Sequence, residues 1–136
     1  MKISFLCALS FLLITACETV PVTVPATLSP AEIIQRAQEA TDRNRYRTAL
    51  KYYQTLVDRN RTNIDLTCAG EYEIAFIHYK QKKYDLAREE FEELLEKYNT
   101  PDEELLPAQY KKLTNIVLAQ ITEKQKRKDF FGNTKK

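Results

Sequence analysis

The sequence predicts an all-α protein of about five helices, two helical hairpins followed by a C-terminal capping helix. Three observations lead to this prediction. Gly occurs only at Gly70 and Gly132, and Trp is absent from the 136 residues, which favours helices over a fold of strands and turns. Apolar residues recur at spacings of three and four along much of the chain. One order of residue types also occurs twice, first from residue 45 and again from residue 83.

The clearest amphipathic helix spans residues 83–97. Its apolar face is formed by Tyr84, Ala87, Phe91, Leu94, Leu95 and Tyr98. The other face carries Arg88, Glu89, Glu90, Glu92, Glu93 and Glu96. Because a single helix cannot bury such a stripe by itself, the chain must supply partner helices.

A matching segment spans residues 45–59. Both segments contain, in the same order, a basic–aromatic pair, an alanine, an aromatic residue, an aliphatic pair and an acidic–basic pair. In the first segment these are Arg45-Tyr46, Ala49, Tyr53, Leu56-Val57 and Asp58-Arg59. In the second they are Lys83-Tyr84, Ala87, Phe91, Leu94-Leu95 and Glu96-Lys97. A fixed period in this range is typical of solenoid proteins, in which repeats stack on their neighbours.

The chain opens with Met1-Lys2 and an apolar run from Ile3 to Ile14, which is typical of an export signal and too short to span a bilayer. The run ends in Ile14-Thr15-Ala16-Cys17, which resembles the lipobox of bacterial lipoproteins. The resemblance implies that residues 1–16 are a lipoprotein signal peptide and that Cys17 becomes an acylated first residue. Several acyl chains would anchor the protein stably in a membrane. The alternative is an ordinary secretory signal in which Cys17 is incidental.

Residues 17–29 contain Pro21 and Pro25 among alternating Val and Thr, which disfavours a helix and favours an extended tether. Such a tether would hold the domain some tens of ångströms from the membrane. Glu18 stands where the resembling lipoproteins carry an inner-membrane retention aspartate. The expected location is therefore the bacterial outer membrane, lipid-anchored and facing the periplasm.

A helical domain is expected over residues 30–128. Two segments have the sequence of a helix start, Ser29-Pro30-Ala31-Glu32 and Thr100-Pro101-Asp102-Glu103. The spacing predicts helices over 30–43, 46–59, 64–81 and 83–97, and a fifth from Pro101 toward Arg127. We expect Gly70 to mark a close packing contact or an irregular first turn, and Pro107 to kink or restart the last helix.

Residues 30–99 resemble the tetratricopeptide repeat, a helix–turn–helix unit with small residues where its helices cross. The small residues match Ala37 and Ala75 in the first helices and Ala49 and Ala87 in the second helices, and the aromatic that follows matches Tyr53 and Phe91. The signature tryptophan is replaced by Ile33 and Glu71, and the period is longer than usual. The resemblance implies helical hairpins that expose a groove, with the fifth helix as the terminal cap. Outer-membrane lipoproteins built of such repeats, including barrel-assembly subunits, look similar.

Few residues suggest chemistry. We expect His78 to pack between helices and Cys68 to be a buried small hydrophobe whose thiol pKa is raised. The carboxylates of residues 89–96 have the spacing of a solvated helix face. The sequence therefore predicts no enzyme, no catalytic residue, no metal and no cofactor.

The C-terminal segment is basic, with Lys124, Lys126, Arg127 and Lys128 followed by Lys135 and Lys136. We interpret its end, residues 129–136, as a flexible basic tail. Contact with an anionic lipid or glycan is the alternative, and nucleic acid is not expected for an exported chain.

The predicted function is a protein-interaction scaffold or adaptor that takes part in an envelope assembly or secretion complex. Spacing places Tyr72, Phe76 and Tyr79 on one helix face, and Ile34 and Tyr110 occupy the equivalent positions before and after Tyr72. We expect these five residues to form one row that binds an envelope protein partner. The alternative is a periplasmic carrier that holds a small ligand between its helices.

Overall fold

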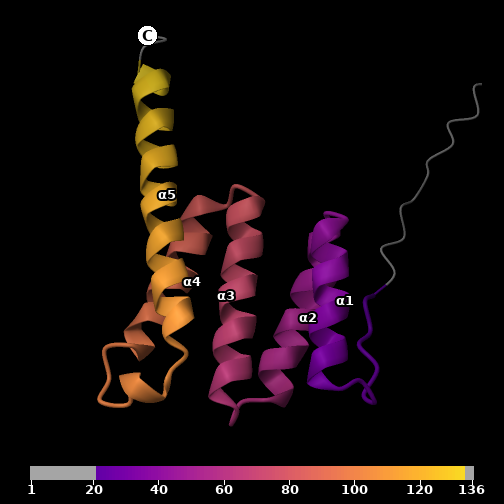
Figure 1. The fold of residues 1–136 in the computed structure, drawn as a ribbon. Helices are drawn as coiled ribbons and strands as arrows, with labels where there is room; N and C mark the ends of the chain where they lie inside the picture. The colour runs from indigo at the N-terminus through magenta and orange to yellow at the C-terminus, as the bar shows by residue number, and fades with distance from the viewer. Residues whose placement is uncertain (1–20, 134–136) are drawn as a thin grey trace, which may run out of the picture.

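The computed structural model describes the backbone of residues 21–133, and within that range it contains helices and no strand (Figure 1). The helices are α1 (Pro30–Asp42), α2 (Tyr46–Arg59), α3 (Ile64–Lys80), α4 (Tyr84–Lys97), the short 3₁₀ helix η1 (Glu103–Leu105) and α5 (Ala108–Asn133). The predicted all-α fold class is confirmed. The bounds of the first four helices agree with the sequence prediction to within one residue.

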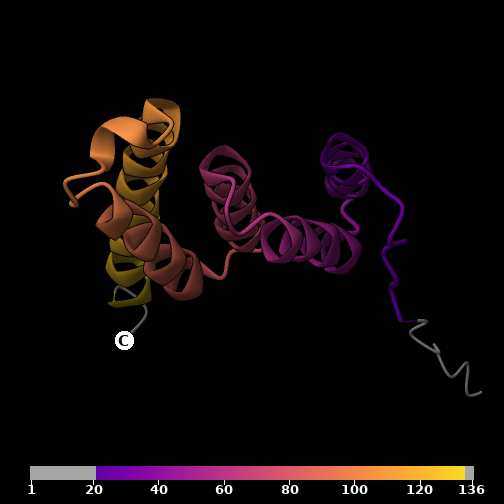
Figure 2. The same cartoon turned by 90° about the horizontal axis from the view of Figure 1, so that it is seen from below.

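Consecutive helices pack against each other, and α3 also contacts α5. Seen along the helices, α1 and α3 lie in one layer while α2 and α4 lie in the other (Figure 2). The buried residues form two clusters. One joins α1, α2 and Ile77 of α3, and the other joins α3, α4 and α5. The arrangement is that of stacked helical hairpins with a terminal helix.

The turns of the two hairpins have the same backbone conformation. Asn44 and Lys82 both adopt a positive φ, of 55° and 62°. In each turn the next residue donates its N–H back across the turn, from Arg45 to the carbonyl of Ala40 and from Lys83 to that of His78. The repeat that was recognised in the sequence is therefore present in the backbone.

Gly70 is buried where α3 crosses α2, and a Cβ on it would overlap Val57. Of the two sequence interpretations of Gly70, close packing is correct. The glycine lies within the regular part of α3, and the helix begins with Asn63 as its side-chain cap.

The two predicted helix starts have different outcomes. Ser29 and Glu32 form the expected capping box at the start of α1. Thr100 caps no helix, because its hydroxyl donates to the carbonyl of Lys97, and only η1 follows. The last helix starts after Pro107, which holds the preceding Leu106 in an extended conformation. The predicted start at Pro101 was wrong, and the predicted restart at Pro107 is confirmed.

Helix α5 continues to Asn133, past the boundary at residue 128 that the sequence suggested. Residues 123–128 are all good helix formers without Gly or Pro, so nothing in them ends the helix. Residues 129–133 are thus part of α5 rather than of a flexible tail, and residues 134–136 lie outside the described range.

The described part of the expected tether, residues 21–29, is fastened to the body of the protein. Val22, Val24 and Leu28 are partly buried against the α1–α2 cluster. The Arg59 guanidinium donates to the carbonyls of Val24 and Pro25, both at 3.0 Å. The segment is not helical, as its prolines predicted, but it turns at residues 26–27, where the Leu28 N–H donates to the carbonyl of Pro25, and it does not act as a free spacer.

Candidate functional site

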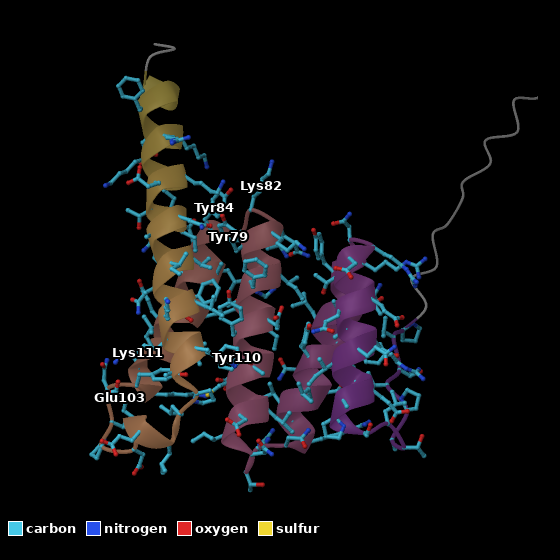
Figure 3. The ribbon with its side chains drawn as sticks, viewed as in Figure 1. Tyr79, Lys82, Tyr84, Glu103, Tyr110 and Lys111 are labelled. Atoms are coloured by element: carbon cyan, nitrogen blue, oxygen red, sulfur yellow. The ribbon has the colours of Figure 1, made fainter. Side chains whose placement is uncertain are left out.

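An aromatic row runs along the side of α3 that faces α5 (Figure 3). It consists of Tyr110 of α5, Tyr72, Phe76 and Tyr79 of α3, and Tyr84 of α4. Neighbouring rings have centroids 5.5 to 5.9 Å apart along the whole row. These separations are typical of favourable aromatic pairs, so the rings hold one another in place.

The row differs from the predicted one in two members. Ile34 packs against the α1–α2 cluster, whereas the rings belong to the α3–α5 cluster, so Ile34 is not part of the row. Tyr84 takes its place beside Tyr79. The sequence carries a signal for Tyr84, which follows Lys83 as Tyr46 follows Arg45, but helical spacing alone predicts a place for it in the buried stripe of its helix.

Exposure divides the row into a base and a surface. Tyr72 is 7% exposed and rests on Phe91, with ring centroids 5.6 Å apart. Burial raises the pKa of Tyr72 above its ordinary value, as it does for Tyr110. Phe76, Tyr79, Tyr84 and Tyr110 are partly exposed. Tyr72 was expected to be an exposed anchor, and instead it supports the row from below.

Polar groups of α5 fix the exposed end of the row. The Tyr79 hydroxyl donates to Oε1 of Gln120 at 2.9 Å, and the Lys124 ammonium lies 6.0 Å from the centre of the Tyr79 ring. A shallow hollow of about 340 Å³ opens here, lined by Tyr79, Ala119, Gln120, Glu123, Lys124 and Arg127. An apolar ring with amide, carboxylate and basic groups around it can hold a side chain of a polypeptide.

His78 has a partner that the sequence analysis missed. Its Nδ1 lies 2.7 Å from Oε2 of Glu90, and both side chains are largely buried. The pair joins α3 to α4 on the side away from the aromatic row. Glu90 was assigned to the solvated face of its helix, and single-sequence spacing gave no signal for a contact across the hairpin.

Cys68 is fully buried, and burial raises the pKa of its thiol, as expected. Within residues 21–133 no three His, Cys, Asp or Glu side chains are grouped as a metal site would require. No helix of the described range is long and apolar enough to cross a membrane. Cys17 lies outside this range.

The fold and the aromatic row define a class of protein, an all-α chain of stacked hairpins with a partly exposed line of rings. A similar protein occurs in Treponema pallidum (strain Nichols), where it is described as an uncharacterized protein. It is 36% identical over 108 residues, which cover 78% of this chain and 43% of the relative. The chain therefore spans less than half of the length of that relative. No family model matches the sequence. No solved structure matches it.

Proposed function

We propose that the protein is a membrane-anchored scaffold of the bacterial envelope that captures a segment of a protein partner on the aromatic row. One observation carries the proposal. Four rings of the row are partly exposed and are held in place by neighbouring rings and by α5. Fixed, partly exposed aromatic rings lose little entropy on binding and are frequent anchors of protein interfaces.

The hairpin repeat supports the same function. Stacked hairpins position a surface rigidly without any chemistry of their own, as the resemblance to tetratricopeptide repeats implies. The hollow beside Tyr79 offers both an apolar wall and charged groups, so it suits a segment with an apolar side chain next to a polar one.

Photo-crosslinking in intact envelopes tests the proposal. A photoreactive residue at position 119, which is exposed and lines the hollow beside Tyr79, should capture the partner, and the same residue at position 55, on α2, should not. Tyr79→Ala combined with Lys124→Ala should abolish capture while helical circular dichroism shows that the chain stays folded. Lys124→Ala alone, which leaves every ring contact of the row in place, should weaken capture without loss of stability. Equal capture from both positions, or capture that survives the double substitution, would contradict the proposal.

The anchor is proposed from the lipobox, with Cys17 as the acylated residue and the outer membrane, on its periplasmic side, as the location. Metabolic labelling with a fatty acid should mark the wild type and leave Cys17→Ser unlabelled. Cys7→Ser is the matched control, because Cys7 precedes the proposed cleavage site and its loss should not change the labelling. Equal labelling of wild type and Cys17→Ser would refute the anchor.

A further inference from the structure

The charges of the protein are separated between the two ends of the helices. The turn from α1 to α2 and the turn from α3 to α4 lie at the same end (Figure 1). Residues 42–47 and residues 80–85 each contain three basic residues and one acidic residue. The other end has no excess of positive charge. Its α4–α5 connection contains Asp102, Glu103 and Glu104 and no basic residue between positions 99 and 107, and residues 58–65 around its α2–α3 connection contain two acidic and two basic residues. We call the end that holds the α1–α2 and α3–α4 turns the basic end.

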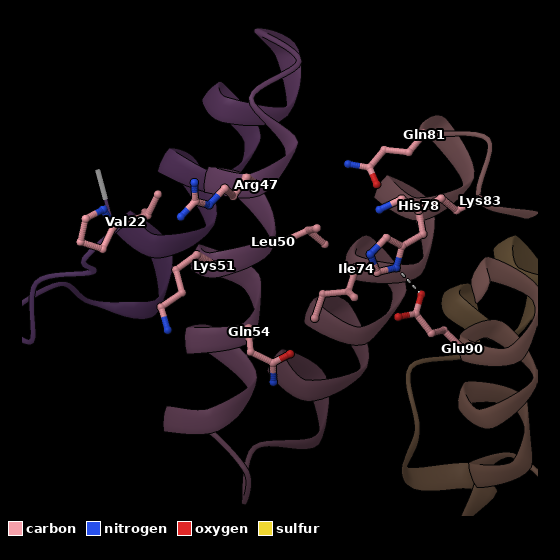
Figure 4. Close-up of a pocket in the computed structure, with 11 residues that line it drawn as sticks. Val22, Arg47, Leu50, Lys51, Gln54, Ile74, His78, Gln81, Lys83 and Glu90 are labelled. Carbon is pink, nitrogen blue, oxygen red and sulfur yellow. Dashed lines mark hydrogen bonds and ion pairs between the residues drawn. The ribbon is translucent and has the colours of Figure 1, made fainter. Parts of the chain in front are cut away.

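A hollow of about 770 Å³ lies near the basic end, between α2 and α4 and across α3 (Figure 4). Leu50 and Ile74 supply apolar lining, and Arg47, Lys51 and Lys83 supply positive charge. Within residues 21–133 none of these three cations has an ion-pair partner. Against Glu90, the one carboxylate of its lining, the three cations give the hollow a net positive charge beside apolar surface.

The remaining polar groups of the hollow indicate which chemical groups its ligand needs. Its carboxylate, Glu90, is already paired with His78. Oε1 of Gln81 is buried and has no hydrogen-bond donor among the described residues. An anion that also carries a hydroxyl or ammonium donor would match both the cations and this free acceptor. The headgroups of anionic phospholipids have that chemistry.

The N-terminal segment brings the hollow close to the proposed anchor. Pro21 and Val22 line the hollow, and the contacts of Arg59 hold the segment that follows. Cys17 lies only four residues before Pro21 in the sequence. Four residues span at most about 14 Å when fully extended. An acyl group on Cys17 would therefore keep the edge of the hollow within reach of the membrane surface.

We propose that the basic end docks on the membrane and that the hollow takes the headgroup of an anionic phospholipid. The inference rests on the proposed lipid anchor for its geometry and adds the orientation of the domain. The domain then lies against the bilayer instead of being held tens of ångströms away. Lysine and arginine side chains near an anionic surface each contribute about a fivefold preference for it at moderate salt.

The test uses the full chain, purified from membranes and reconstituted into vesicles of phosphatidylcholine, with or without one quarter phosphatidylglycerol. Flotation reports whether the chain is anchored, and lysine acetylation followed by mass spectrometry reports which end is covered. Acetylation of Lys51 and Lys83 should slow by at least about fivefold when phosphatidylglycerol is present, because the docked form is then favoured by at least the preference that one basic side chain contributes. Lys112, in the first turns of α5 at the opposite end, should react equally in both vesicles.

Two variants with the same change of charge complete the test. Lys82 lies next to Lys83 in the same turn, so its acetylation should also slow in the wild type. Lys51→Glu with Lys83→Glu should abolish this slowing at Lys82, whereas Arg61→Glu with Lys112→Glu should preserve it. Equal acetylation in both vesicles by a chain that floats overturns docking and leaves the anchor intact. A chain that floats with neither vesicle overturns both proposals. Inorganic phosphate is added to the neutral vesicles as a further probe. If it slows the acetylation of Lys51 and Lys83 as much as phosphatidylglycerol does, the hollow binds a free anion and docking is overturned.

Discussion

Gly70 of α3 lies so close to Val57 of α2 that a methyl group on Gly70 would be 2.6 Å from Val57 Cγ2. The same methyl group would lie 3.5 Å from the carbonyl oxygen of Tyr53. The close contact allows α2 and α3 to pack with few gaps at the junction between the two hairpins. A glycine inside a helix is otherwise unfavourable, so packing is the physical reason for its presence.

Gly70→Ala should therefore lower the free energy of unfolding. Overpacking in a core costs about 1–3 kcal/mol, which outweighs the gain of about 1 kcal/mol in helix propensity for most of that range. Urea unfolding followed by circular dichroism measures the change. Val57→Ala in the same chain should relieve the overlap and recover most of the loss. A single variant as stable as the wild type would show that the Val57 side chain moves aside at little cost.

The bounds of α1 to α4 could be predicted because the hairpin pattern occurs twice in the sequence. A helix boundary that is visible in one copy indicates where the equivalent boundary lies in the other. The segment after Tyr98 has no second copy. There the motif at Thr100 predicted a helix start, but the helix begins only after Pro107. The Pro107 carbonyl accepts a hydrogen bond from the Tyr98 hydroxyl at 2.8 Å, and Leu106 is buried, so both contacts fix the segment between α4 and α5. A local motif does not reveal which distant group the chain will meet.

The candidate site was predictable only within one helix. Helical spacing placed Tyr72, Phe76 and Tyr79 on one face correctly, but the repeat offset placed Ile34 in a row that it does not join. A shared position in two repeats fixes the direction of a side chain and not its contacts. Composition likewise predicted an extended N-terminal segment, while its fastening depends on Arg59, 34 residues beyond Pro25.

Thr114→Val should stabilise the protein. Thr114 is fully buried in α5, and its hydroxyl has no hydrogen-bond partner in the described part of the chain. Valine has nearly the same shape and removes a buried polar group, which is expected to add about 1 kcal/mol to the free energy of unfolding. Thermal melts measure the change.

Thr122→Val is the matched control on the same helix. The Thr122 hydroxyl donates to the carbonyl of Leu118 at 3.0 Å and accepts from the Arg88 guanidinium at 3.1 Å. This substitution should lower the melting temperature or leave it unchanged. If Thr114→Val destabilised the protein more than the control, the Thr114 hydroxyl would have to have a partner, such as an ordered water.

Glu73→Gln should stabilise the protein at neutral pH and have little effect in acid. Burial raises the pKa of the Glu73 carboxyl, and Lys80 opposes that shift only in part. Because its pKa is higher in the folded state than in the unfolded state, the carboxyl favours folding when protonated, and this contribution is lost as the pH rises. Glutamine removes the penalty for burying the ionised form.

The melting temperatures of Glu73→Gln and wild type should therefore differ at pH 7 and converge at about pH 4, near the ordinary pKa of glutamate. Glu89→Gln, which removes an exposed carboxylate of α4, is the matched control for the loss of one negative charge. A Glu73→Gln variant that is less stable than the wild type at pH 7 would mean that the carboxylate has a favourable partner.

Arg59→Ala should release residues 21–28 from the body of the protein. The Arg59 guanidinium makes two hydrogen bonds to this segment, and the other contacts are those of Val22, Val24 and Leu28. Losing about 1.4 kcal/mol of this interaction would raise the population of the open segment about tenfold. Cleavage by thermolysin beside these apolar residues, followed by mass spectrometry, should accelerate by the same factor.

Arg61→Ala is the control, because in the described structure Arg61 pairs only with Asp58, at 3.2 Å. Its cleavage rate should equal that of the wild type.

The Arg59→Ala variant also tests membrane docking. When residues 21–28 are released, the link between Cys17 and the folded domain lengthens from four residues to about a dozen. A link of that length reaches some tens of ångströms. Arg59→Ala should then weaken the slowing of Lys51 acetylation on anionic vesicles. Unchanged cleavage would show that the apolar contacts alone hold the segment and that Arg59 does not set its distance from the membrane.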